Sequence, residues 1–469
     1  MKRREFIKLS TRTAMALTLS GLYSPLNAGS NTLPKVVINV MLDGGPDFRH
    51  LIVPIYDNST SSDSYAAKFW QARASIFGVS SSDELKDAYK EHYETVDIGP
   101  EKYGILKKAS WLKVHIEAGN VAIISNAIGS TDRNHHHAQL MMESGNMNAS
   151  PYNQDVSGWM GRSASILTQN VVSITSEVRL SCNGPHLTDP KRHDNRCVVN
   201  NYKSRDMNLY FYDTQNDSKH SEKAIMSRAL RSYYTAKSDT IPTSSPYYKA
   251  MQHEKQLREF GDQIQTILKN NDTPEEILNL TKKDHENKLN SSYFARQISS
   301  CYDSFLTRDI LDMRLASMEY TGWDSHKNLR NQIEPKFEDM FGTGKGFDAL
   351  VSSLDIKDKE IYEKTVIVIS GEFGRQHLSN GDHGNDHGRG NTVLVIGGDI
   401  EGGLYGDIFP DSEKDKLNTK NADIKGETSM LKIYSAILDW QEAGLGEKVF
   451  GTLDGQSVET RVTLSDIFP

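Results

Sequence analysis

Cysteine is scarce in this chain: three of its 469 residues are cysteines, at positions 182, 197 and 301. Folds that depend on disulfide bonds need several paired cysteines, so a disulfide framework is excluded. In an exported chain, Cys182 and Cys197 are close enough in sequence to pair, which would leave Cys301 alone. Three separate thiols are equally compatible with the sequence.

The chain also lacks long apolar runs and an excess of basic residues. Its mean hydropathy of −0.56 excludes a protein with several membrane-spanning helices. The formal net charge of −8 argues against nucleic acid as the main partner. Two catalytic motifs are missing as well. Without a Gly-x-x-x-x-Gly-Lys-Ser/Thr phosphate loop or a Gly-x-Ser-x-Gly elbow, we do not expect an NTP-driven motor or a serine esterase.

The N-terminus carries two adjacent arginines. Arg3 and Arg4 precede Phe6 and Lys8, which is typical of a twin-arginine signal peptide. The weakly apolar stretch that follows is too short and polar to span a membrane stably. We therefore expect residues 1–30 to be a signal peptide read by the twin-arginine translocase. The mature chain, with no transmembrane anchor, would be periplasmic or extracellular. The alternative to a signal peptide is an N-terminus that is merely basic and disordered.

Apolar, β-branched runs end beside carboxylates in two places. Residues 33–42 lead into Asp43, and residues 365–369 lead into Glu372. Such runs are typical of strands buried on both faces of a parallel sheet. The carboxyl ends of parallel strands share one edge, where open α/β sheets keep their active sites. The two carboxylates are therefore expected to lie close together.

Two further motifs carry histidine. Asp324 and His326 end a possible strand, and in an extended segment residues i and i+2 share a face, so both can reach one ion. The second motif, the pair Asp386 and His387, precedes the run 392–396, which also resembles a buried parallel strand. Since glycine, asparagine and aspartate dominate turns, each motif alone would fit an ordinary turn equally well. Carboxylates and imidazoles are ligands for hard and borderline metals, and the candidate ligands are Asp43, Asp324, His326, Glu372, Asp386 and His387.

The chain divides by composition into a core and an insertion. Residues 31–200 and 301–469 carry the strand-like runs and form the two parts of an α/β core, the second with the metal-site motifs. Residues 201–300 are charged and have apolar side chains at helical spacing. Thr273 and Pro274 suit a helix start, as N-cap and first residue. This block is expected to be a helical insertion or cap packed on or over the core.

The order of these motifs resembles a known family. Leu-Asp-Gly-Gly, Gly-Trp-Asp-Ser-His, Ser-Gly-Glu-Phe-Gly-Arg, Asn-Asp-His-Gly and Ile-Gly-Gly-Asp-Ile-Glu-Gly-Gly-Leu-Tyr-Gly follow one another as in an exported bacterial family catalogued as domain of unknown function 1501. The resemblance covers most of the chain after the leader and is weakest in the middle third. That family is similar in its core to alkaline phosphatases and sulfatases. The resemblance implies a doubly wound, mostly parallel sheet sandwiched by helices, with metal ions at its carboxyl edge. It points to Asp43, Asp324, His326, Glu372 and His387, with Asp386, as ligands.

One position departs from the family pattern. Where the family has Arg-Ser-His-Phe-x-Ala-Gln, this chain has Asn134 in place of the serine nucleophile. Thr131 or Ser130 is then the nucleophile, or water attacks directly. His135 suits either a ligand or a general acid/base, and the next two histidines resemble a surface tract. No cysteine lies in the Cys-x-Pro-x-Arg setting of the sulfatases.

The sequence thus predicts an exported, metal-dependent hydrolase of phosphate or sulfate esters. Divalent ions (zinc, manganese or calcium) would polarise the ester and activate water. The catalytic residues would be His135, Thr131 and Arg375. Arg375 either clamps an anionic oxygen or forms a structural ion pair with Glu372 or a neighbour. The substrate would be a small anionic ester or a sulfated or phosphorylated glycan. The alternatives are a non-catalytic metal-binding scaffold in cell-surface or polysaccharide assembly, and a phosphomutase or lyase on the same core.

Overall fold

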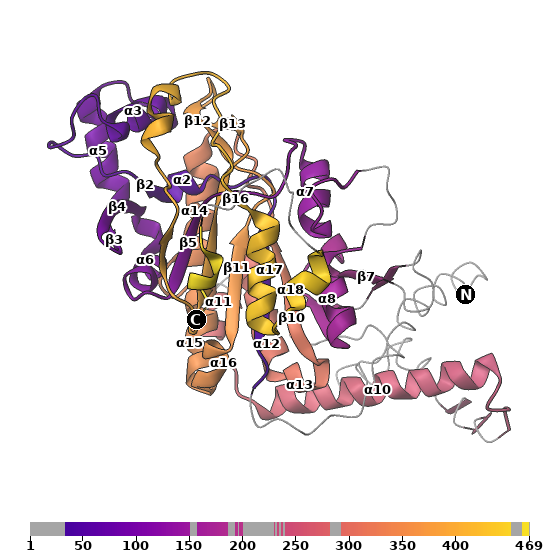
Figure 1. Ribbon diagram of the computed structural model, residues 1–469. Helices are drawn as coiled ribbons and strands as arrows, with labels where there is room; N and C mark the ends of the chain where they lie inside the picture. Colours follow the sequence, from indigo (N-terminus) through magenta and orange to yellow (C-terminus); the bar gives the residue numbers. More distant parts are fainter. Residues whose placement is uncertain are drawn as a thin grey trace.

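The computed structural model of this protein describes most of the chain after the leader (Figure 1). The described residues are 33–150, 157–185, 193–195, 197–199, 229, 232–233, 236–237, 240–281, 292–451 and 462–468. The predicted signal peptide, residues 1–30, lies outside them. Among the described residues, no helix is both long and apolar enough to cross a membrane.

A nine-stranded sheet forms the centre of the molecule. Its strands, in spatial order, are β15 (Gly403–Tyr405), β5 (Val121–Ile128), β14 (Asn391–Gly397), β11 (Thr365–Ser370), β1 (Val36–Leu42), β10 (Met313–Tyr320), β6 (Asn170–Ser173) and β9 (Cys197–Val199), with β16 (Thr428–Ser429) also paired to β5. Every residue of β1 is buried, as its apolar sequence predicts. β1 is parallel to both neighbours, with Leu42 opposite Tyr320 and Met41 opposite Ser370. The carboxyl ends of β10, β1 and β11 are therefore level.

The direction of one strand differs from the prediction. The run at 392–396 forms β14, but β14 is antiparallel to both β11 and β5. A parallel connection needs a crossover, usually a helix. Between β11 and β14 the chain instead forms a two-stranded ribbon, β12 (Arg375–Ser379) and β13 (Asn385–His387), and returns directly. The sheet is mixed, although most of its pairs are parallel.

Helices cover both faces of this sheet. Alternate β1 side chains enter two separate cores, Ile38 and Val40 on one face and Val37 and Met41 on the other. The first core includes α3 (Tyr65–Ala72), α5 (Ser82–His92), α6 (Ser110–Glu117), α12 (Tyr293–Leu306), α14 (Leu329–Phe341) and α15 (Gly346–Lys357). The second includes α8 (Trp159–Leu167), α17 (Met430–Gln441) and α18 (Leu445–Phe450). The fold is an α/β sandwich with helices on both faces of a mostly parallel sheet.

Short elements complete the fold. They are α2 (Phe48–Leu51), β2 (Ile52–Val53), α4 (Ala74–Phe77), β3 (Tyr93–Ile98), β4 (Glu101–Leu106), α7 (His135–Ser144), β7 (Asn183–Pro185), β8 (His193–Asn195), α13 (Arg308–Leu311) and α16 (Lys359–Glu363). Of the two cysteines that the sequence allows to pair, Cys182 is a free, buried thiol, as is Cys301. Cys182 therefore makes no disulfide with Cys197.

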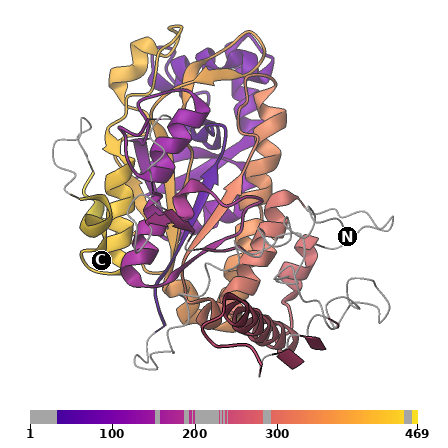
Figure 2. The same cartoon turned by 90° about the vertical axis from the view of Figure 1, so that its right-hand side faces the viewer.

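The described part of the insertion is helical. It contains α10 (Pro246–Asn270), α11 (Glu275–Thr281) and the core helix α12. α10 contacts α13, which leads directly into the amino end of β10. Figure 1 shows α10 along the bottom of the molecule and β12 and β13 at its top, and α10 also lies at the bottom in Figure 2. α10 therefore lies at the end of the sheet away from its carboxyl edge.

A network of buried charges lies between the loop after β1 and the β12–β13 ribbon. Arg73 pairs with Asp47 at 2.7 Å, and Arg49 pairs with Glu413 at 2.8 Å. His377 Nε2 is 3.3 Å from Glu413 Oε2, and the imidazole is 1% exposed. Burial, followed by the neighbouring Arg49 guanidinium, lowers the pKa of His377 to about 4. His377 is therefore neutral in the fold at physiological pH.

We expect the free energy of unfolding to fall as the pH drops from about 6.5 to about 4, because the unfolded chain then binds a proton that folded His377 does not. This one group contributes a slope of at most about 1.4 kcal/mol per pH unit. Denaturant unfolding of wild type and His377→Gln over this range should give a smaller slope for the variant. Equal slopes would contradict the assignment.

Candidate functional site

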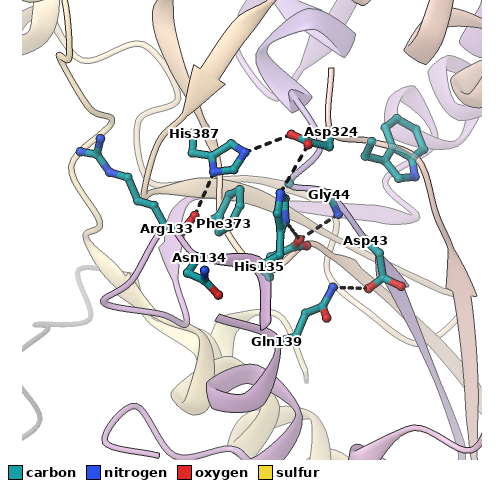
Figure 3. Close-up of polar contacts among 12 residues, drawn as sticks. Asp43, Gly44, Arg133, Asn134, His135, Gln139, Asp324, Phe373 and His387 are labelled. Carbon is teal, nitrogen blue, oxygen red and sulfur yellow. Dashed lines mark hydrogen bonds and ion pairs between the residues drawn. The ribbon is translucent and has the colours of Figure 1, made fainter. Parts of the chain in front are cut away.

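The level ends of three strands bring the predicted ligands to one edge of the sheet (Figure 3). Asp43 follows β1, Asp324 and His326 follow β10, and Glu372 follows β11. Two more elements reach the same edge: β13 carries Asp386 and His387, and His135 is the first residue of α7. The cluster is therefore assembled from parts of the chain more than 300 residues apart.

Three ligand-type atoms face one another at its centre. Asp324 Oδ1 lies 3.1 Å from His326 Nε2 and 3.0 Å from His387 Nε2, and the two imidazole nitrogens are 2.9 Å apart. The opposite nitrogens are also bonded: His326 Nδ1 lies 3.0 Å from Asp386 Oδ1, and His387 Nδ1 lies 2.8 Å from the carbonyl of Arg133. Because a carboxylate and a carbonyl can only accept, we assign the ring protons to Nδ1. Both Nε2 atoms then carry lone pairs, and both lie within 3.1 Å of Asp324 Oδ1.

His135 faces the same carboxylate from α7. Its Nδ1 lies 2.8 Å from Glu372 Oε1, and its Nε2 lies 3.5 Å from Asp324 Oδ2. The hydrogen bond to Glu372 raises the pKa of His135, in spite of partial burial. The ring packs against Phe373, with centroids 5.0 Å apart. Three imidazoles thus each use Nδ1 on an oxygen and have Nε2 within 3.5 Å of an Asp324 oxygen.

Glu372 lies beneath the cluster and is fully buried. Its Oε1 accepts from the backbone N–H of Gly44 at 2.8 Å as well as from His135. Within the described part of the chain, Glu372 Oε2 is buried and has no hydrogen-bond partner. A buried carboxylate oxygen without a partner is costly, so a cation or water is expected beside it.

Arg375 lies under the cluster rather than facing a ligand. Its side chain is buried, and Nη2 donates to Asp324 Oδ1 at 2.7 Å. Its other contacts are the carbonyl oxygens of Gly44, Gly45, Trp323 and Asn385. Burial would raise the pKa of Asp324, but the hydrogen bond and the charge of Arg375 oppose it, and that pKa is lowered to about 2. The sequence allows two roles for Arg375. This geometry matches the structural one, an ion pair with Asp324, which lies near Glu372.

Gly44 lets the first strand end approach the second. Its φ is +117°, and a Cβ atom there would lie 2.3 Å from the backbone nitrogen of Asp324. An alanine would be strained and would push the Asp324 loop away. The Leu-Asp-Gly-Gly motif is therefore explained by close backbone packing.

Asp43, at the border of the cluster, has a different partner from its other members. Arg179 binds both of its oxygens, Nη1 to Oδ2 at 2.7 Å and Nη2 to Oδ1 at 2.9 Å, and Gln139 donates to Oδ1 at 3.3 Å. Burial raises the pKa of Asp43 to about 6, although Arg179 opposes this shift. Sequence reasoning missed Arg179, which lies in no recognisable motif. The backbone carbonyl of Arg133 was also missed.

The candidate nucleophiles make contacts outside the cluster. Thr131 Oγ1 and Ser130 Oγ contact the sulfur of Met141 at 3.8 and 3.4 Å. Asn134 is the N-cap of α7, and its Oδ1 accepts from the backbone of His137. This capping role explains why asparagine suits the position. His136 is exposed.

The donor set fits a borderline metal ion such as zinc. Zinc takes imidazole nitrogen and carboxylate oxygen at about 2.0–2.2 Å, which puts tetrahedral ligand atoms about 3.3 Å apart. The atoms of Asp324, His326 and His387 are 2.9 to 3.1 Å apart. The ligand atoms of His135, Asp324 and His387 also lie within 4.8 Å of one another. Histidine ligands usually donate their second N–H to a carboxylate or carbonyl, as these three do.

We expect Asp386→Asn to weaken zinc binding by about 10- to 100-fold, because Asp386 fixes the orientation and protonation of His326. Competition with a zinc-binding dye measures the change. Asp382→Asn is the matched control, since Asp382 lies in the turn that leads into β13, carries the same charge and pairs with Lys327 instead. Equal affinities in the two variants would show that Asp386 does not support a ligand.

Comparison with known proteins identifies the family but no activity. None of the curated proteins matches the chain. A family model described as "Protein of unknown function (DUF1501)" matches residues 34–424. The matched region includes every residue of the cluster, from Asp43 to His387. Because the match spans most of the 469 residues, the chain belongs to the DUF1501 family.

Proposed function

We propose that this protein is an exported, metal-dependent hydrolase of phosphate or sulfate esters, with a core of the alkaline phosphatase and sulfatase type. One observation carries the proposal: His135, His326 and His387 all have Nε2 within 3.5 Å of an Asp324 oxygen while Nδ1 is bonded to oxygen. Lone pairs gathered this closely around a carboxylate repel it and one another unless a cation or proton lies between them. A divalent ion between Asp324, His326 and His387, zinc by its donor set, would relieve the repulsion among these three and leave Nε2 of His135 free.

The residues around that ion would have two roles, binding it and orienting its ligands. Asp324, His326 and His387 would hold it, and Asp386 and the Arg133 carbonyl would orient the two imidazoles. The bound ion would supply Lewis acidity toward the ester oxygens. Its substrates would be small anionic esters or sulfated or phosphorylated glycans.

His135 and Glu372 form the acid/base pair of the proposed reaction. Glu372 holds Nδ1, which leaves Nε2 to take a proton from the attacking water, and the carboxylate then stabilises the imidazolium. As the ester bond breaks, the imidazolium returns this proton to the leaving alkoxide oxygen. Water is the nucleophile because Asn134 caps α7 and the hydroxyls of Ser130 and Thr131 contact Met141. No covalent phospho- or sulfo-enzyme is expected.

A non-catalytic metal-binding scaffold is the second candidate. Asn134 favours it, since the family's serine nucleophile is missing. The His135–Glu372 pair favours hydrolysis, because a ring held by a buried carboxylate at 2.8 Å is built to exchange a proton. A phosphomutase or lyase on this core has no specific observation in its support.

We expect His135→Ala to lower turnover by about 10²- to 10⁴-fold while bound metal stays near the wild-type level, because a general base contributes to rate rather than to metal affinity. Bound metal is measured by elemental analysis and turnover on a panel of phosphate, phosphodiester and sulfate esters. His136→Ala, at the exposed neighbouring position, is the control and should keep both.

Other results would separate the roles. Parallel loss of metal and activity in His135→Ala would make His135 a ligand. A fully metallated wild type that turns over no ester in the panel would favour the scaffold.

Export can be tested separately. Replacing both Arg3 and Arg4 by lysine should leave the protein in the cytoplasm, because the twin-arginine translocase reads the pair rather than the charge. Cell fractionation measures this, with Lys2→Arg as a control that keeps the pair. Continued export of the double variant would mean that another pathway reads the leader.

A further inference from the structure

Arg179 sits at the centre of three carboxylates beside the proposed metal centre. Besides both oxygens of Asp43, it binds Glu319 Oε2 through Nη1 at 3.0 Å. Its Nε donates to Glu143 Oε1 at 2.9 Å, and Nη2 contacts the same oxygen. Every nitrogen of the guanidinium is therefore bonded to a carboxylate.

These carboxylates are held in place by three elements of the core. Asp43 directly follows β1, Glu319 lies in β10 next to the strand end, and Glu143 comes from α7, the helix that begins with His135. Asp43 N–H donates to the carbonyl of Tyr320 at 2.9 Å, so the two strand ends are tied together. The three side chains and Arg179 are at most 15% exposed.

Such a pocket has the ligands of a hard metal ion. Three carboxylates gather around the Arg179 guanidinium, and buried carboxylates need a compensating cation. The guanidinium is always charged and its flat fork matches carboxylates in pairs. The pocket is distinct from the imidazole-rich cluster, since its described ligand atoms are all oxygens.

We propose that Arg179 is the resident cation of this second pocket, and that the centre therefore holds one metal ion where two could fit. Asp43 is then a partner of Arg179 rather than a metal ligand, which revises the expectation from sequence. The inference rests on the proposed function only for the ion that Asp324, His326 and His387 would hold. Whether a metal ion can replace Arg179 can be measured independently of that ion.

The test is a calcium titration of zinc-saturated wild type and Arg179→Ala. Calcium is the probe because it selects oxygen ligands, whereas zinc prefers the imidazoles. Calorimetry and elemental analysis after desalting should find no bound calcium in wild type and one equivalent in Arg179→Ala. Calcium should also raise the unfolding temperature of the variant but not that of wild type.

The matched control is Arg162→Ala. Arg162 is also largely buried, but its guanidinium binds the carbonyls of Ser144, Ser157 and Val449 instead of carboxylates. Its loss removes a buried cation without leaving a ring of acidic ligands. This variant should therefore take up no calcium.

Each outcome decides the proposal. A stoichiometric calcium ion in wild type, or a folded Arg179→Ala that binds none, would overturn it. If Arg179→Ala folds only with calcium present, the proposal is supported; if it fails to fold with and without calcium, the carboxylates do not accept an ion in place of the guanidinium and the proposal is wrong. Absence of zinc from wild type would count against the proposed hydrolase, but it leaves the calcium comparison intact.

Discussion

The hydrogen bonding of the Arg375 guanidinium is the constraint on which the site depends. A buried guanidinium is stable only when its donors are all paired, because desolvating the charge costs several kcal/mol. Every nitrogen of Arg375 has an acceptor among four backbone carbonyls and Asp324, which come from the loops after β1 and β10 and from β13. In the β12–β13 ribbon it lies opposite His387. One side chain therefore fixes the loops after β1 and β10, and β13, relative to one another.

The fold supplies the rest of the geometry through strand register. Because β10, β1 and β11 are parallel and end level, three loops leave the sheet together. Gly44 has no side chain, so its loop can pack on the backbone of Asp324 and still donate to Glu372. The ribbon that replaces a crossover helix then turns His387 back over the same edge. The apolar strands are thus buried and fixed in the core, and the segments that follow them carry the side chains of the candidate site.

The strands and most of the cluster could be predicted from the sequence, because both leave local signals. A β-branched run followed by a carboxylate was enough to place Glu372 and Asp43 at one edge. Strand direction left no such signal: the run at 392–396 is apolar whichever way β14 points. Arg179 could not be found either, since its partners Asp43, Glu143 and Glu319 meet only in three dimensions. Long-range ion pairs have no sequence period.

The imidazoles of the cluster differ in a way that separates their roles. Hydrogen bonding to Glu372 raises the pKa of His135, whereas burial lowers the pKa of His387 despite its bond to Asp324. A neutral imidazole binds a metal, and one with a raised pKa can take up a proton near neutral pH. Neighbouring groups whose environments push their pKa values apart are the arrangement that acid/base chemistry requires. The carboxylate on the far side of His135 therefore matters as much as the ligands, since Glu372 holds Nδ1 and leaves Nε2 to exchange a proton.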